Sequence, residues 1–453
     1  IDGTGSFIAA NNLVVNVTGD VNNQGLLVGR NTLNVKALNL TNENGGVIAG
    51  DYLQLNTVND LTNKSLIRAG SAANLEVSGN FNNQIDTYST SSTKGLSSGS
   101  RTDISQLATI YIGDTLKGQT DKQGNPLITF NANVGGNTTF DAGILDNQGG
   151  STRINTAGDT NLNAINTGYQ TNAIGDANNY FKQVKTRDIG SQITGTNDII
   201  IKSGGRVTGK ALQVNTSGGD ISLRGRKGVK LTAGHQTDNL STANTYKEDK
   251  WYGDKKISQK FNATSDTAVT SDLKANNITI NSEQGDVSLI GANADAKGLA
   301  EVTAMNGKVT IESVVDKQSQ SSSKSTENFY KETAKQQGFE KETLNQTGVI
   351  GSSVYINGQN VAINAANVQA KDGALQIGDA TLATDDNGNF KLDDNGKPIV
   401  LTGSIDNLDL GTIELENREW DEKQKGYKGI AKGVMQVAGA VGGALGITDG
   451  ITI

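Results

Sequence analysis

The sequence predicts an all-β protein, a right-handed parallel β-helix with protruding arms or hairpins between its coils. Three observations lead there: a phrase that recurs about every twenty residues, apolar residues that alternate within each period, and 56 Gly with only 2 Pro in 453 residues. A period this short cannot bury a hydrophobic face alone and becomes stable by stacking on its neighbours. Ladders between stacked coils tolerate turn glycines but exclude residues that lack an N–H donor.

The recurring phrase sets the regular coils of residues 1–84. It reads "VNNQGLLVG" from Val21, "LTNENGGVIAG" from Leu40, "LTNKSLIRAG" from Leu61 and, truncated, "FNNQ" from Phe81. An asparagine follows each apolar opener two places later, at Asn23, Asn42, Asn63 and Asn83. Stacking brings these side chains above one another at the turns. Their amides are then expected to hydrogen-bond along the stack as an Asn ladder.

Within each period the apolar residues alternate, as in "LVVNVTG" and "TLNVKALNL". Alternation places Leu and Val on one face of a strand and Asn, Lys and Thr on the other. Leucine-rich repeats have a similar length but need a helix or turn side with a regular Leu pattern. Here two or three short strands fill each period, separated by Asn and Gly. Roughly 300–350 residues would build about 15–18 coils, each adding about 4.8 Å.

A larger repeat of about 70 to 80 residues begins past residue 85 and dominates 160–375. Each copy has two or three coils and one long polar excursion that returns to a strand, so we expect three arms aligned on one side of the rod. Adjacent aromatic residues mark the arms, at Tyr180 and Phe181, Trp251 and Tyr252, and Phe329 and Tyr330. Such rings can cover the flank of the rod, pack against another chain or lie at a membrane interface.

Two related insertions divide the remaining coils, one within 85–159 and one within 376–417. Their "DKQGNP" and "DDNGKP" cores are typical of hairpin turns. In the second insertion Asp385, Asp386, Asp393 and Asp394 cluster, which raises the question of calcium. The EF-hand pattern needs Gly at its sixth position and Glu at its twelfth, where Phe390 and Gly396 stand instead. We therefore expect hairpin turns and no metal site.

Residues 418–453 have a different character: a charged run, then a Gly/Ala-rich apolar segment. Glycines recur four apart between Gly429 and Gly433, Gly439 and Gly443, and Gly442 and Gly446, a spacing that lets helices pack closely in lipid. One interpretation is a junction to a further domain, with a short helix at most. The other is a segment that inserts into a target membrane, for which its length just suffices.

Composition narrows the function classes. A net charge of −7 disfavours a nucleic acid as partner. The absence of cysteine excludes disulfides, thiolate metal sites and cysteine nucleophiles. No cofactor motif occurs, and the single histidine, His235, has no Ser and Asp partners in the sequence that would make a catalytic triad. The chain starts in mid-pattern with no secretory signal, so we expect it to be a piece of a longer protein.

The coils with "GDVNNQG"-like turns, the "IGDTLKGQTDKQGNPLITF" insertion and the "KWYGDKKIS"-type arms resemble the haemagglutinin repeats of filamentous haemagglutinin exoproteins. They are especially similar to the repeat region near the C-terminus of contact-dependent growth inhibition exoproteins. The resemblance covers nearly all of residues 1–417. It implies a secreted bacterial cell-surface filament, exported by an outer-membrane two-partner secretion transporter.

Three functions follow, in order of preference. The first is a structural filament segment that helps a contact-dependent growth inhibition protein deliver its C-terminal toxin into neighbouring bacteria. The second is an adhesin rod that touches host or neighbouring cell surfaces. The third is a polysaccharide-degrading enzyme, because parallel β-helices also carry lyases and hydrolases; it requires paired carboxylates along one groove.

Overall fold

A computed structural model describes residues 6–251, 253–378, 381–382, 400–401 and 406–427. The described residues form an all-β protein in which no helix occurs. The strands belong to one hydrogen-bonded network of 38, apart from a short antiparallel pair, β37 (Thr381–Leu382) and β38 (Val400–Leu401). The C-terminal segment in which a short helix was considered lies outside the described residues.

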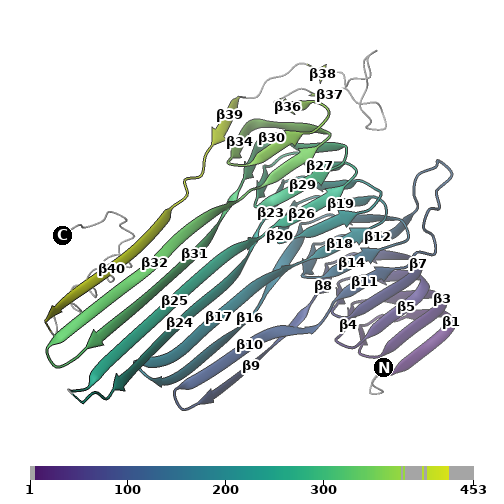
Figure 1. Ribbon diagram of the computed structural model, residues 1–453. Helices are drawn as coiled ribbons and strands as arrows, with labels where there is room; N and C mark the ends of the chain where they lie inside the picture. The colour runs from purple at the N-terminus through teal and green to yellow at the C-terminus, as the bar shows by residue number, and fades with distance from the viewer. Residues whose placement is uncertain (1–5, 252, 379–380, 383–399, 402–405, 428–453) are drawn as a thin grey trace.

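Most strands stand in three parallel columns, which together we call the stacked body (Figure 1). The first column consists of β2 (Val21–Asn23), β4 (Leu40–Asn42), β6 (Leu61–Asn63), β8 (Phe81–Gln84), β13 (Thr138–Asp141), β16 (Thr160–Asp176), β20 (Arg206–Lys210), β23 (Gly228–Thr232), β28 (Val287–Ile290), β30 (Leu299–Glu312), β34 (Ser353–Asn364) and β39 (Asn407–Gly411). The second consists of β1 (Phe7–Asn16), β3 (Leu26–Ala37), β5 (Val47–Thr57), β7 (Leu66–Val77), β11 (Thr109–Ile112), β14 (Ile144–Asn147), β18 (Gln192–Gly195), β21 (Gln213–Thr216), β26 (Ser271–Ala275), β29 (Ala292–Ala296), β33 (Gly348–Gly351) and β35 (Asn367–Ala370).

The third column starts in the second halves of the long strands β1, β3, β5 and β7, beyond a register shift. It continues through β12 (Ile128–Val134), β15 (Ser151–Thr156), β19 (Ile199–Ser203), β22 (Ile221–Gly225), β27 (Ile278–Ser282), β30, β34 and β36 (Leu375–Ile377). Among the described residues each column therefore holds twelve strands, fewer than the 15 to 18 coils expected from the sequence. The expectation was too high because the arms use more of the chain than three excursions would.

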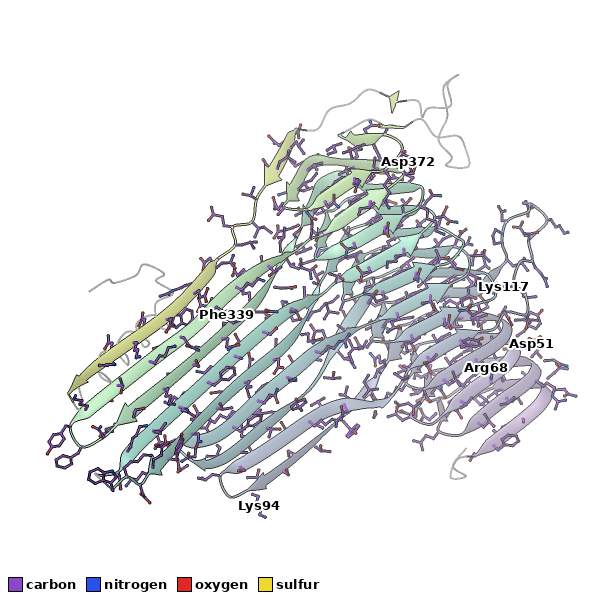
Figure 2. The ribbon with its side chains drawn as sticks, in the orientation of Figure 1. Asp51, Arg68, Lys94, Lys117, Phe339 and Asp372 are labelled. Carbon is purple, nitrogen blue, oxygen red and sulfur yellow. The ribbon has the colours of Figure 1, made fainter. Side chains whose placement is uncertain are left out.

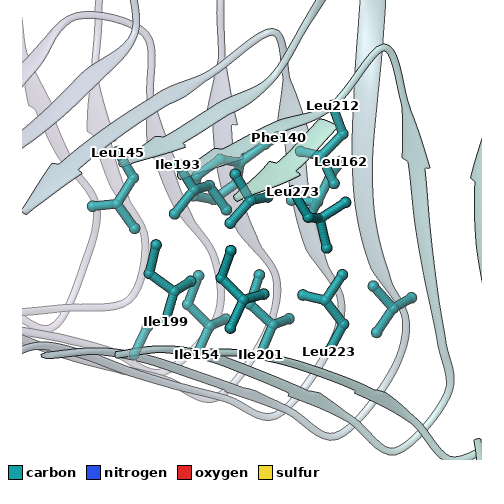
Figure 3. Packing of buried hydrophobic residues seen from close by; sticks show 14 of the residues in the cluster. Phe140, Leu145, Ile154, Leu162, Ile193, Ile199, Ile201, Leu212, Leu223 and Leu273 are labelled. Carbon is teal, nitrogen blue, oxygen red and sulfur yellow. The ribbon is translucent and has the colours of Figure 1, made fainter. Parts of the chain in front are cut away.

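The core lies between the three columns. One coil contributes Phe140, Leu145 and Ile154, one residue from each column, and all three are fully buried (Figure 3). Along the first column Phe81 packs edge-to-face on Phe140, with ring centroids 5.6 Å apart. Most of the buried apolar residues form one cluster from Leu27 to Ile363, and Ile85, Ala108 and Ala142 form a second, small cluster. The alternation in the sequence thus builds one narrow main core.

Four hairpins leave the stacked body, each after a strand of the first column. They pair β9 (Asp86–Lys94) with β10 (Ser97–Gln106), the far half of β16 with β17 (Asn179–Gly190), β24 (Gly234–Glu248) with β25 (Lys255–Val269), and β31 (Val314–Glu327) with β32 (Lys331–Asn345). Each hairpin also pairs antiparallel with the next, and β40 (Asn417–Tyr427) adds a ninth strand. The result is one continuous antiparallel sheet, which we call the lateral sheet (Figure 1).

From β8 onward, coils with an arm alternate with coils that have none. In these armless coils one residue in the left-handed region closes the same corner: Ala142, Ala211, Gly291 or Ala365, with φ between 50 and 61°. Three of these are alanines, in a conformation that non-glycine residues seldom adopt. The strain indicates that this corner is dictated by the stacking of the neighbouring coils and not by the local sequence.

The alternation has a geometric cause. A hairpin is two strands wide, about 9.6 Å, and two coils rise by the same distance. One hairpin for every two coils therefore fills the lateral sheet without gap or crowding. The sequence leaves two or three coils per arm open and marks three arms; the structure has two coils per arm and four hairpins. The extra hairpin, β9–β10, is rich in Ser and Thr and lacks the adjacent aromatic pair that marks the others.

The first insertion forms an exposed loop at 113–127, closed by an antiparallel bridge between Thr120 and Pro126. At its tip Asp121 accepts hydrogen bonds from the backbone N–H groups of Gln123 and Asn125. The bond from Asn125 is the main reason that the pKa of Asp121 is lowered. The equivalent turn of the second insertion, with Asp385, Asp386, Asp393 and Asp394, lies outside the described residues.

Candidate functional site

The four asparagines of the repeat lie one above another at the end of the short first-column strands. Asn23 donates its side-chain amide to Asn42 Oδ1 at 2.8 Å, Asn42 donates to Asn63 at 2.9 Å, and Asn63 donates to Asn83 at 2.8 Å. The last three are fully buried. Each amide also donates to a backbone carbonyl of a neighbouring strand. These contacts form a ladder that satisfies buried polar groups and fixes how the first coils stack.

The ladder stops where Phe140 pairs with Asn83 in the next coil. Beyond this point, buried hydroxyl groups at the roots of the arms make the polar contacts between coils. On the return from an arm to the stacked body, Ser191 donates to the carbonyls of Phe140 and Asn163, Ser271 to Thr232, and Thr347 to Glu312. All three side chains are fully buried. Sequence reasoning missed them; the available signal was a small hydroxyl residue at the start of "SQIT", "SDLK" and "TGVI".

A carboxylate ties the second arm to the stacked body. Asp188 of β17 lies 2.8 Å from the ammonium of Lys210 in β20, and accepts hydrogen bonds from Asn166 and from the backbone N–H of His235. Burial raises the pKa of Asp188, but the bonds from Lys210, Asn166 and His235 together outweigh it, so the pKa is lowered. The carboxylate stays charged and holds two arms and one coil together.

Trp251 and the pair Phe329 and Tyr330 lie at distal turns of the lateral sheet. Trp251 is in the turn between β24 and β25 and is 96% exposed. Phe329 and Tyr330 form the turn between β31 and β32, are 75% and 72% exposed, and contact each other edge-to-face at 4.6 Å. Tyr252 lies outside the described residues. Rings at the far end of the arms cannot cover the flank of the stacked body, which was one of the interpretations of the sequence.

The third pair has a different setting. Tyr180 and Phe181 are consecutive residues at the start of β17, so their side chains point to opposite faces of the lateral sheet. Tyr180 is half-buried under the ammonium of Lys182, which lies 4.9 Å from the ring centroid, while Phe181 is 39% exposed. Figure 2 shows side chains along both faces of the sheet, with Phe339 on β32 labelled.

Other candidate residues are placed as follows. His235 hydrogen-bonds Asp266 through Nδ1 at 3.0 Å, an exposed pair at the root of the third arm. Within the described part of the chain, no cluster of three or more potential metal ligands occurs. No helix that could cross a membrane is found among those residues. The C-terminal glycines Gly429, Gly433, Gly439, Gly442, Gly443 and Gly446 lie outside them.

Comparison with known proteins adds nothing to this description, because no family model, curated protein or solved structure matches the chain.

Proposed function

We propose that the fold is a right-handed parallel β-helix whose arms have merged into a lateral sheet. In support, Leu40 pairs in parallel with both Val21 and Leu61, and Leu61 pairs with Phe81, so that each coil lies on the next at the period of the repeat. Crossover connections between parallel strands of one sheet are right-handed in nearly all proteins. Further coils can be added along the axis of such a body, which suits a filament.

On this basis we propose that the chain is a structural segment of a secreted bacterial surface exoprotein of the filamentous haemagglutinin class. It would leave the cell through an outer-membrane two-partner secretion transporter and help a contact-dependent growth inhibition protein deliver a C-terminal toxin into neighbouring bacteria. The stacked body is the rigid spacer in this proposal. The lateral sheet is the part that meets the target cell.

The observation that carries the proposal is the position of Trp251, Phe329 and Tyr330. They project at successive distal turns, the farthest points of the arms from the stacked body, and their large exposed rings are of the kind that marks a contact surface. Aromatic side chains with one apolar and one polar end are enriched where protein meets a membrane interface or another protein. A contact surface at the tips of a rigid sheet is the simplest use of this arrangement.

The test is a variant of the full-length exoprotein with Trp251→Ser, Phe329→Ser and Tyr330→Ser. Surface display is measured by antibody labelling and delivery by inhibition of target cells. Normal display with lost inhibition supports the proposal. A matched control is Tyr52→Ser, which removes a ring that is 46% exposed on the stacked body and should change neither value.

Other outcomes discriminate the alternatives. Normal display and normal inhibition in the triple variant would refute a role of the distal turns in delivery. If inhibition is unchanged but attachment to host or neighbouring cells falls, the adhesin rod is the better description. A polysaccharide-degrading activity that is lost when residues in a groove of the stacked body are changed would assign the chain to the enzyme class instead.

A further inference from the structure

One face of the lateral sheet carries a hollow that the distal turns do not explain. Phe261 of β25 lies directly across from Thr242 of β24 and Ser322 of β31, and Ser322 lies across from Gln337 of β32. Directly opposed residues share a face, so these four side chains form one row across four strands. The hollow over this row measures about 430 Å³.

The next row toward the distal turns is basic. Gln259 lies across from Lys324, Lys324 from Lys335, and Lys335 from Lys423. Three lysines thus stand side by side on three neighbouring strands, an arrangement in which like charges destabilise a sheet.

Only one of these charges is balanced by a nearby carboxylate. Lys335 pairs with Asp421 at 3.3 Å, and both side chains are largely exposed. Lys324 and Lys423 have no ion pair among the described residues. The positive potential over the hollow is therefore not neutralised by the protein around it.

Uncharged hydrogen-bonding groups also belong to the lining. Asn244 and Gln259 provide amides, Thr242 and Ser322 provide hydroxyls, and Phe261 is the only aromatic ring. A single half-buried ring among amides and hydroxyls suits a ligand with one apolar face and many hydroxyls. Opposed lysines suit a ligand that also carries a negative group, since an ammonium binds oxyanions through charge-assisted hydrogen bonds.

We propose that this hollow binds an anionic saccharide, with its carboxylate, phosphate or sulfate on Lys324 and Lys335 and its sugar ring on Phe261. The open, flat sheet around the hollow leaves room for a chain to continue in both directions. This binding site goes beyond the role proposed for the distal turns. It is tested on the isolated chain, so it can fail or hold whatever delivery experiments give.

The probe is a short oligogalacturonate, whose every sugar carries a carboxylate, titrated calorimetrically into the 453-residue chain. A maltooligosaccharide of equal length is the neutral comparison, and inorganic phosphate the free anion. We expect the oligogalacturonate to bind, the neutral chain to bind at least about tenfold more weakly, and phosphate to bind more weakly than the oligogalacturonate.

Variants locate the site. Lys324→Gln with Lys335→Gln should weaken oligogalacturonate binding by about tenfold or more. Phe261→Leu should weaken it while leaving phosphate binding unchanged. The matched control is Lys182→Gln with Lys256→Gln, which removes the same charge from the opposite face of the sheet, outside the lining of the hollow, and should have no effect. Lys324→Arg with Lys335→Arg should restore binding, which separates a lost charge from a damaged fold.

Several results would overturn the proposal. These are equal binding of the neutral oligosaccharide, unchanged binding after the Lys324 and Lys335 exchange, or equal losses in the control variant. Vesicles of phosphatidylglycerol distinguish a lipid source of the negative charge: binding to these vesicles without binding to oligogalacturonate would assign the surface to a membrane and refute the saccharide site.

Discussion

The match between one hairpin and two coils can be broken by removing one coil. Deleting residues 191–211 joins Gly190 to Leu212, takes out an armless coil and puts arms on successive coils. The roots of neighbouring hairpins are then one coil apart, about 4.8 Å, although each hairpin is about 9.6 Å wide, which is a mismatch of about 4.8 Å. We expect the junction between β17 and β24 to separate. Eight residue pairs join these strands, from Tyr180–Ala243 to Arg187–Gln236.

The size of the loss follows from that junction. At about 0.5–1.5 kcal/mol net for each hydrogen bond, losing the eight pairs costs on the order of 4–12 kcal/mol. The stacked body should remain folded, because each coil is stabilised by contacts with its neighbours. The damage is therefore local, and an assay that reports only overall folding would miss it.

A longer deletion is the matched control. Deleting residues 191–270 joins Gly190 to Ser271 and removes two coils together with one arm, so the alternation survives. The strand register is also kept. Tyr180 pairs with Ala243 and Lys260 pairs with Ser323, so the second pair lies 80 residues after the first in both strands, which equals the length of the deletion. In this larger deletion β17 should pair with β31. We expect the longer deletion to disturb the lateral sheet less than the shorter one.

Cysteine crosslinks provide the assay, because the chain has no cysteine of its own. Lys182→Cys with Ser241→Cys should crosslink on oxidation in the intact chain but not after deletion of 191–211. After deletion of 191–270, Lys182→Cys should crosslink with Ser321→Cys. A third pair, at Ser91 and Ser100 of the first arm, should crosslink in every form and verify folding. Efficient crosslinking of Lys182 with Ser241 in the shorter deletion would refute the reasoning.

Two further predictions concern the stacked body. Asn63→Leu removes the ladder hydrogen bonds that Asn63 makes with the buried Asn42 and Asn83, and it should lower the free energy of unfolding by about 2–6 kcal/mol. This loss should be smaller than that of Leu61→Asp, which buries an unpaired charge in the core; thermal unfolding that ranks them the other way would show that inside and outside are misassigned. Burial raises the pKa of Glu301, against the opposing hydrogen bonds of Thr303 and Thr279, so the charged carboxylate costs stability at neutral pH and the cost disappears as the pH falls below about 4. Glu301→Gln should accordingly raise the unfolding midpoint at pH 7 and leave it unchanged at acid pH; an equal shift at both would contradict the assignment.

Some of the candidate sites could be predicted from the sequence and others could not. Asn63 and its equivalents could be predicted because each coil repeats the same phrase, so the stacking of coils is visible in the sequence as a repeat of about twenty residues. The aromatic residues of the arms were found as pairs, but their setting was not. Trp251 projects from a turn while Phe181 lies on a sheet face, a difference set by where each hairpin reverses.

The lysine row could not have been found from the sequence. Lys324, Lys335 and Lys423 come from three strands and stand side by side only through the register of the lateral sheet. Their neighbours in the sequence, such as the serines before Lys324, give no sign of it. The same holds for the β9–β10 hairpin, whose Ser- and Thr-rich strands have no buried face to impose an alternation.

By itself, then, the sequence determined the coil: its length, its apolar interior and the asparagines that align one coil with the next. These are set by contacts between equivalent residues about twenty positions apart, which leave a repeated pattern. Only the tertiary structure decided that the arms form one sheet, with an arm on every second coil. That outcome rests on an equality of widths between a two-stranded hairpin and two stacked coils, and backbone hydrogen bonds impose it whatever side chains the strands carry.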